Sequence, residues 1–341
     1  MILKYKSFDL ELKHTFGIAR SSHKIQRTLI VSLEQGGFTG YGEAVENSYY
    51  GFTIEGMTRR LEELRSKIEN YSLENPEEFW DYMNQFLDKN RFLHCAVDIA
   101  ANDLYGKIKD KPLYKLWGLN TDNIPMTNYT IGLDKIDVMI SKMRDFPWPL
   151  YKIKLGTNKD IEIVKTLRNF SDSRFRIDAN ASWGVEETIS NSIELKKLGV
   201  EFIEQPLEAR DWSGMEKVYA KSQLPLIADE ACRTEVDVPK SVNRFHGINV
   251  KLVKAGGLTP ARRMIIEAKK LGLKTMVGCM TESSVGIAAV GQLLPYLDYV
   301  DMDGALLLKN DIAKTHKIVD GKITLSDLPG TGVEMKVKDL V

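Results

Sequence analysis

The chain has 341 residues, of which 43% are hydrophobic and 28% are charged, and its 47 basic residues balance its 47 acidic residues. This composition is that of an ordinary globular protein, and the length favours one large barrel with a smaller domain beside it. Because the formal net charge is zero, the chain lacks the long-range attraction that polyanion binders use, and nucleic acid is not an expected partner.

Signals for export, membranes and cysteine chemistry are not found in the sequence. No apolar stretch is long enough to span a membrane, and residues 1–8 lack the pattern of a signal peptide. The three cysteines are widely spaced with no CxxC pair, and the five histidines form no HxH or HExxH pair. We therefore expect a cytoplasmic protein without a disulfide framework, a zinc knuckle or a Ser-His-Asp triad.

The first part of the chain predicts strands followed by helices. The expected strands are at 2–12, 28–34 and 38–43, and the expected helices are at 53–68, 76–87 and 91–108. Between the first two strands, residues 16–24 are polar, and we expect a loop that reaches over an active site, because such loops often carry function. Gly118 and Pro125 then punctuate the chain and mark the expected domain boundary.

From Pro125 onward, strand-like runs recur with helical patterns between them. The eight runs are 126–130, 151–155, 175–179, 201–205, 226–229, 247–252, 275–279 and 299–302. This repeat predicts an α/β fold of the TIM-barrel kind. After the eighth run, Asp320-Gly321 indicates a hairpin, and the tail is expected to return to the first domain. We therefore expect a capping domain of residues 1–120 joined by 316–341, and a barrel of residues 121–315.

Charged side chains end several of these strands, at the edge where such barrels carry their chemistry. Asp178, Glu204 and Asp229 end three consecutive strands. Converging carboxylates raise one another's pKa unless a cation neutralises them, and oxygen ligands without Cys or His suit Mg²⁺ or Mn²⁺. The alternative is that each acid only caps a helix or pairs with a neighbouring lysine.

Three lysines flank these acids. Lys152 and Lys154 share one face of a strand, and Lys251 lies on a strand across the barrel. Lys154 and Lys251 could approach one substrate carbon from its two faces, and desolvation beside other cations should lower their pKa toward a value useful for proton transfer. Loss of a proton beside a carboxylate leaves an enediolate, which a metal stabilises. The alternative for Lys152 and Lys154 is a solvated strand edge.

The combined motifs resemble the enolase superfamily, specifically its muconate lactonizing enzyme subgroup. They are Lys152-Ile153-Lys154, Asp178-Ala179-Asn180, Glu204-Gln205-Pro206, Asp229-Glu230, and Lys251 with Gly256-Gly257. The resemblance covers essentially the whole chain. It implies a modified TIM barrel of (β/α)7β form, with an α+β capping domain formed by the N-terminal segment and the C-terminal tail.

The resemblance also implies roles for individual residues. Asp178, Glu204 and Asp229 would bind Mg²⁺, and Lys154 and Lys251 would be the acid/base pair. Lys152 would assist at the substrate carboxylate, while Asn180 and Glu230 would support the ligands from behind, with Glu230 orienting Lys251.

Within this subgroup, the last strands distinguish the reactions. Strand seven ends in residues 278–283 without a histidine, which disfavours the mandelate racemase-like branch. Asp301 and Asp303 share one strand face and would bind a cation. The α-ammonium of a dipeptide is such a cation, and this Asp-x-Asp pair resembles the pair that dipeptide epimerases carry.

The expected activity is Mg²⁺-dependent epimerisation of L-Ala-D/L-Glu or a related dipeptide, by a two-base 1,1-proton transfer at the C-terminal residue's α-carbon. Arg20 resembles the arginine that binds the glutamate side chain, and Lys24 or Arg27 could replace it. An N-acylamino acid racemase or a cycloisomerase of the same subgroup stays open, as does a non-catalytic barrel that binds metal and anions. The expected partner is a small dipeptide, with a homo-oligomer left open and cell-wall peptide metabolism implied by the family alone.

Overall fold

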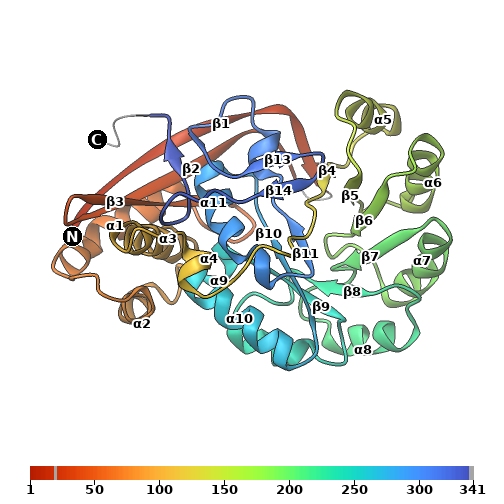
Figure 1. The fold of residues 1–341 in the computed structure, drawn as a ribbon. Helices are drawn as coiled ribbons and strands as arrows, with labels where there is room; N and C mark the ends of the chain where they lie inside the picture. Colours follow the sequence, from red (N-terminus) through yellow and green to blue (C-terminus); the bar gives the residue numbers. More distant parts are fainter. Residues whose placement is uncertain (19–20, 338–341) are drawn as a thin grey trace.

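The computed structural model describes residues 1–18 and 21–337, and Figure 1 shows an antiparallel sheet with its helices beside a parallel barrel. The antiparallel sheet has the order β1-β2-β3. Its elements are β1 (Ile2–Ile18), β2 (Ser21–Gln35) and β3 (Phe38–Val45), followed by α1 (Ile54–Glu69), α2 (Pro76–Leu87), α3 (Arg91–Ile108) and the short α4 (Leu113–Leu116).

Small residues bring α3 against the capping sheet. A Cβ on Gly42 of β3 would lie 2.0 Å from the carbonyl oxygen of Ala96, so only glycine permits this approach of strand and helix. The helix is buried over most of its length, which explains the small residues that the sequence places there.

The stretch expected as a loop at 16–24 is largely strand in the described residues, and that expectation was wrong. β1 and β2 continue toward the hairpin tip, where Phe16 pairs with His23 and Gly17 pairs with Ser22. The barrel holds this hairpin: the Leu133 N–H donates to the carbonyl oxygen of Gly17 at 2.9 Å, and a Cβ on Gly17 would lie 2.6 Å from the Leu133 oxygen. The polar residues of this stretch led to the prediction of a loop, whereas hydrogen bonding between the two strands gives the backbone its extended conformation.

Eight parallel strands form the barrel, in the order β11-β10-β9-β8-β7-β6-β5-β4. The strands are β4 (Tyr129–Ile131), β5 (Leu150–Lys154), β6 (Arg174–Asp178), β7 (Val200–Glu204), β8 (Leu226–Ala228), β9 (Gly247–Lys251), β10 (Lys274–Gly278) and β11 (Tyr299–Asp301). One parallel bridge, between Thr127 and Val300, joins the two end strands. The predicted modified TIM barrel is confirmed.

Helices surround the barrel, and Figure 1 shows α5 to α8 along its outer side. They are α5 (Ile136–Asp145), α6 (Asp160–Phe170), α7 (Val185–Lys197), α8 (Trp212–Lys221), α9 (Leu252–Ala255), α10 (Leu258–Lys270) and α11 (Ser284–Leu293). In the part of the chain that the structure describes, no helix combines the length and the apolar character needed to cross a membrane.

The tail after β11 contacts α3 and α4. It contains β12 (Ala313–Lys314), β13 (Lys317–Val319), β14 (Lys322–Thr324) and β15 (Glu334–Met335), with the predicted Asp320-Gly321 turn between β13 and β14. The Thr331 N–H donates to Asp103 Oδ1 at 2.8 Å, and the Leu113 N–H donates to the Gly330 oxygen at 3.0 Å. These contacts support the proposed division into a capping domain of 1–120 with 316–341 and a barrel of 121–315.

Buried carboxylates of the capping elements accept hydrogen bonds at the N-termini of two barrel helices. Glu43 of β3 accepts from the N–H groups of Ser283 and Gly286, at 3.0 and 2.9 Å, at the start of α11. Asp98 of α3 accepts from the Thr259 N–H at 3.0 Å, at the start of α10. Because a carboxylate satisfies the unpaired N–H groups of a helix terminus, these contacts fix the capping sheet relative to the barrel.

Candidate active site

A cavity of about 850 Å³ lies between the carboxyl ends of the barrel strands and the capping elements. Its barrel side includes both lysines proposed as bases and four acids: Lys154, Lys251, Asp229, Glu230, Asp301 and Asp303. Its capping side includes Phe16, His23, Arg27 and Tyr50. The charges that the sequence singled out are therefore collected at one opening, although they come from strands far apart in the chain.

Three carboxylates converge below this cavity. Asp178 and Glu204 are the last residues of β6 and β7, and Asp229 directly follows β8. Their ligand atoms lie within 4.8 Å of one another, and all three side chains are buried. Parallel neighbouring strands end at the same edge, which is why residues 25 or so positions apart meet here.

The turn after β7 holds Glu204 and Asp229 in place. Gln205 has a φ of 37°, a left-handed conformation that costs energy for a residue with a side chain. Its amide bonds at both ends: Oε1 accepts from the N–H groups of Asp229 and Ala231, each at 3.0 Å, and Nε2 donates to the Leu207 oxygen at 2.7 Å. Gln205, which directly follows the proposed ligand Glu204, therefore positions the backbone of Asp229, the next proposed ligand.

Lys152 lies among the carboxylates, almost fully buried. Its Nζ is 3.1 Å from Asp178 Oδ2, 2.8 Å from Glu204 Oε2 and 2.9 Å from Asp301 Oδ2. Burial opposes its charge, but these three acids raise the pKa of Lys152 well above its ordinary value. Lys152 thus links the three-carboxylate cluster to Asp301; its expected contact with a substrate carboxylate stays a prediction.

Lys154 and Lys251 enter the cavity from opposite sides of the three carboxylates. Lys154 ends β5 and Lys251 ends β9, and strands β6, β7 and β8 lie between them. The Nζ of Lys154 is 2.6 Å from Asp178 Oδ2, and the Nζ of Lys251 is 2.9 Å from Asp229 Oδ2. Each lysine is therefore paired with one of the proposed metal ligands.

The pKa of Lys251 is raised in the protein alone, and the lowered pKa expected for this lysine beside a bound metal stays a prediction. Burial is the largest single effect and lowers the pKa, but Asp229, Glu204 and Asp178 together raise it by more. A divalent cation on these same acids would oppose their effect on the lysine.

The donor set fits a hard divalent cation. Six buried carboxylates face four buried lysines around the cavity: Asp178, Glu204, Asp229, Glu230, Asp301 and Asp303, with Lys152, Lys154, Lys251 and Lys254. A dication would neutralise the three converging carboxylates, and oxygen ligands suit Mg²⁺. The side-chain oxygens of Asn180 and Asn249 are also buried without a hydrogen-bond donor among the described residues, which leaves further oxygen near the cluster.

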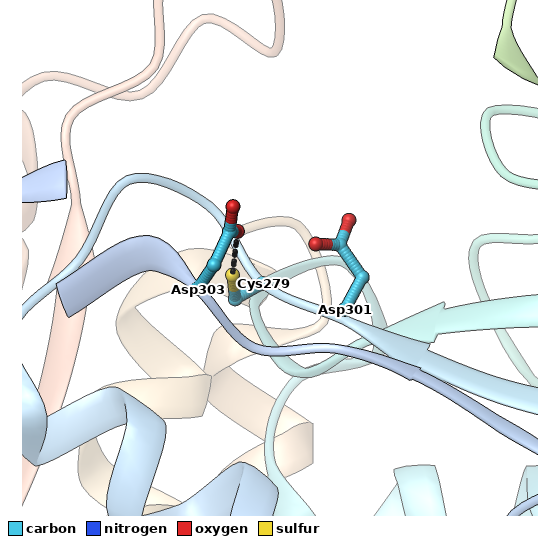
Figure 2. Close-up of side chains that lie close together, drawn as sticks. All are labelled: Cys279, Asp301 and Asp303. Carbon is cyan, nitrogen blue, oxygen red and sulfur yellow. Dashed lines mark hydrogen bonds between the residues drawn. The ribbon is translucent and has the colours of Figure 1, made fainter. Parts of the chain in front are cut away.

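Asp301 and Asp303 form a second acidic group beside Cys279, and Figure 2 shows their side chains pointing to the same side. Asp303 Oδ2 accepts from the Thr130 N–H at 2.5 Å, and its Oδ1 lies 4.0 Å from Cys279 Sγ. Burial, followed by the charge of Asp301, raises the pKa of Asp303 to about 8. Burial acts on Asp301 as well, yet Lys152 lowers the pKa of that carboxyl to about 2. One acid of the pair is charged and the other is protonated at neutral pH.

Two further residues at the site escaped the sequence reasoning. Lys254 is fully buried and donates to both the carboxylate and the carbonyl oxygen of Asp229, the latter at 2.5 Å. Tyr50 lines the cavity, and Arg233 lies over its ring at 4.7 Å. The spacing of Lys254, three residues after Lys251, could have indicated the first; nothing local distinguishes Tyr50 from its neighbour Tyr49.

Of the candidate cations on the capping side, Arg20 lies outside the described residues. Lys24 is exposed and does not line the cavity, whereas Arg27 does. Arg27 is already paired with Glu55 at 2.7 Å and with Glu46 at 3.2 Å. Its guanidinium is therefore partly neutralised by these two acids.

Comparison with known proteins places these features in one family. Residues 6–118 match the N-terminal domain of mandelate racemase and muconate lactonizing enzyme, and residues 141–340 match the enolase C-terminal domain-like family. The L-Ala-D/L-amino acid epimerase of Flavobacterium johnsoniae is 58% identical over 98% of this chain and 100% of its own length. A protein of the same name from a Maribacter species is 54% identical over 98% of this chain and 99% of its own.

Solved structures show the same architecture. A substrate-liganded complex of the L-Ala-D/L-Glu epimerase from Bacillus subtilis has a TM-score of 0.93 and 25% identity, and the match covers 98% of each chain. A dipeptide epimerase from Enterococcus faecalis, complexed with Mg and the dipeptide L-Leu-L-Tyr, has a TM-score of 0.91 and 28% identity over 97% of this chain and 98% of its own.

Proposed function

The chain belongs to the enolase superfamily, in the family of mandelate racemase and muconate lactonizing enzyme, and on this premise we propose that it is an isomerase that epimerises dipeptides. The substrate is L-Ala-D/L-Glu or a related dipeptide, and the α-carbon of its C-terminal residue is inverted. One observation carries the proposal: two lysines reach one cavity from opposite sides of a three-carboxylate cluster.

In the proposed site, Asp178, Glu204 and Asp229 hold Mg²⁺. Bound there, the ion would neutralise negative charge that builds up on the substrate carboxylate as the α-proton leaves. Mn²⁺ has the same ligand preference and is a weaker candidate. A relative complexed with Mg and a dipeptide supports this choice.

Lys154 and Lys251 perform the proton transfer in this proposal. One lysine, as the neutral amine, takes the α-proton from one face, and the other, as the ammonium, returns a proton to the opposite face. Their roles exchange with the direction of the reaction. The two lysines therefore have to differ in protonation when substrate binds, although each is paired with a carboxylate in the protein alone.

Asp301 and Asp303 bind the α-ammonium of the dipeptide in this proposal. Both carboxyls are buried and line the cavity; Asp301 is ionised, and a bound cation would favour ionisation of Asp303. An N-acylated amino acid has no such cation, so these acids favour a free dipeptide over the substrate of an N-acylamino acid racemase.

The relatives' names support alanine as the first residue and leave the second residue broader than glutamate. The family implies a role in the turnover of cell-wall peptides, and the sequence pattern favours the cytoplasm as the compartment. The test is to incubate L-Ala-L-Glu with the protein and Mg²⁺ in D₂O and to follow the α-proton by NMR. Epimerisation with one deuteron gained at the C-terminal residue supports the proposal. The same assay is run on a library of other dipeptides, and the proposal is excluded when no dipeptide exchanges its α-proton.

A further inference from the structure

A chain of hydrogen-bonded side chains runs from Glu201, which is half-buried, to the buried Asp301. Glu201 Oε2 accepts from Arg176 Nε at 2.7 Å, and Arg176 Nη1 donates to Asn128 Oδ1 at 3.3 Å. Asn128 Nδ2 in turn donates to Asp301 Oδ1 at 2.7 Å. Asn128, Arg176 and Asp301 are 0%, 3% and 4% exposed, so water does not compete for the bonds that join these three residues, whereas Glu201 is half-buried.

The arginine fixes which way the asparagine amide points. An amide has an acceptor end and a donor end, and a 180° flip exchanges them. Arg176 has only donors, so it selects the orientation in which Asn128 Oδ1 faces the guanidinium and Nδ2 faces Asp301. Arg176 is held in turn by Glu201 and by the Val300 oxygen at 2.9 Å.

The orientation of Asn128 has a consequence for Asp301. One carboxylate oxygen of Asp301 accepts from Asn128, and the other accepts from Lys152 at 2.9 Å. Two donors of different origin fix the plane of the carboxylate, so its remaining lone pairs have a set direction. Asp303 differs in its donors, because it accepts from the Thr130 N–H and from the Cys279 thiol.

We propose that Asn128, oriented by Arg176, is a positioning residue that fixes the carboxylate of Asp301 for the α-ammonium of the substrate. This inference rests on the proposed function, because it assumes that Asp301 binds an ammonium. Asn128 acts through Asp301 and does not touch the substrate. Its effect is therefore confined to ligands that carry the ammonium, whereas a role in barrel packing would affect all ligands alike.

The experiment compares two ligands that differ only in the ammonium. For L-Ala-L-Glu, kcat and KM are measured with Mg²⁺; for N-propionyl-L-Glu, which lacks the amino group, the inhibition constant is measured against the dipeptide. The variant Asn128→Leu keeps the side-chain volume and removes the donor. We expect KM to rise about tenfold, since a charge-assisted hydrogen bond to a buried carboxylate is lost, with kcat and the inhibition constant changed less than about threefold.

Two further variants keep the test decisive. Arg176→Met removes the donor that orients the Asn128 amide. KM for L-Ala-L-Glu should rise, by less than in Asn128→Leu, while the inhibition constant of N-propionyl-L-Glu stays nearly unchanged. This variant tests the inference even where Asn128→Leu folds poorly. Asn102→Leu is the matched control. Asn102 is another buried asparagine, and its Nδ2 donates to the buried Asp98 Oδ1 at 3.1 Å. Neither residue lines the cavity. The control variant should lower the unfolding midpoint and leave both ligands unaffected.

The outcomes separate this inference from the proposed function. If the wild-type protein binds N-propionyl-L-Glu as well as the dipeptide, the ammonium role of Asp301 and Asp303 is wrong. If the wild-type protein discriminates between the ligands but Asn128→Leu and Arg176→Met weaken both equally, or neither, the positioning role of Asn128 is overturned while the proposed function stands.

Discussion

Lys251 Nζ lies 2.9 Å from Asp229 Oδ2, so a residue proposed as a base and a residue proposed as a metal ligand form one buried ion pair. The same relationship recurs across the barrel, where Lys154 is paired with Asp178. Binding of a cation by Asp229 and release of a proton by Lys251 are therefore coupled, because this carboxylate stabilises the ammonium beside it.

The first prediction concerns the two lysines. Lys154→Ala and Lys251→Ala should each lower kcat for epimerisation by about 10²–10⁴-fold or more. Each variant loses one of the two groups that carry out general acid–base catalysis, whose contribution is typically of this size. Each variant should still exchange the α-proton of one epimer with D₂O, through the lysine that remains. NMR of both epimers measures this. Lys165→Ala, at an exposed helix position, is the control, and epimerisation retained in either active-site variant would contradict the two-base proposal.

The second prediction concerns the metal. Asp178→Asn should weaken Mg²⁺ binding by more than the 10–100-fold that changes behind a metal ligand usually cause. Isothermal titration calorimetry on the protein without substrate gives this affinity independently of activity. Chelation of the metal should abolish epimerisation and lower the unfolding midpoint. The exposed Asp172→Asn variant should bind Mg²⁺ normally, and equal affinities for both variants would remove Asp178 from the metal site.

The third prediction concerns Lys152. Lys152→Met keeps the stem but removes a buried charge that contacts Asp178, Glu204 and Asp301. Loss of one partner from a buried ion pair typically costs roughly 3–5 kcal/mol, because the other charge is left without compensation. We expect denaturant unfolding to show a loss of this order, partly restored by Mg²⁺. A variant with the same free energy of unfolding as the wild-type protein would contradict this prediction, because the acids would then be protonated without loss of stability.

The fourth prediction is a pH dependence at the ammonium site. Burial and the charge of Asp301 raise the pKa of Asp303 to about 8, so this carboxyl is protonated below pH 8 and ionises as the pH rises through that value. The ammonium of a dipeptide needs the ionised acid, and an α-amino group itself loses its proton near pH 8. KM for a free dipeptide should therefore fall from pH 6 toward 8 and rise again above it.

The matched measurements isolate Asp303 in this profile. Asp303→Asn should raise KM and remove its fall between pH 6 and 8, because no group is left to ionise at that position. The inhibition constant of N-propionyl-L-Glu should stay flat over the same range. A profile identical in the wild-type protein and Asp303→Asn would assign the dependence to another group.

The sequence alone predicted most of the barrel and the identity of the charged strand ends. The strand repeat and the residues at each carboxyl end, such as Asp178 and Glu204, are local properties of the chain, and parallel topology then brings them to one edge. The expected loop at 16–24 was wrong because the pairing of Phe16 with His23 is a contact between strands, which polarity does not encode.

Local pattern therefore determined which residues carry charge and on which strand they lie, and the tertiary structure decided what each charge faces. The carboxylate paired with Lys251 is Asp229, and the hydrogen bonds that fix the Asp301 carboxylate come from Asn128 and Lys152. These partners come from other strands of the barrel and are 22, 173 and 149 residues away along the chain. Electrostatic energy depends on distance in space and on burial, and neither is a property of the sequence read one segment at a time.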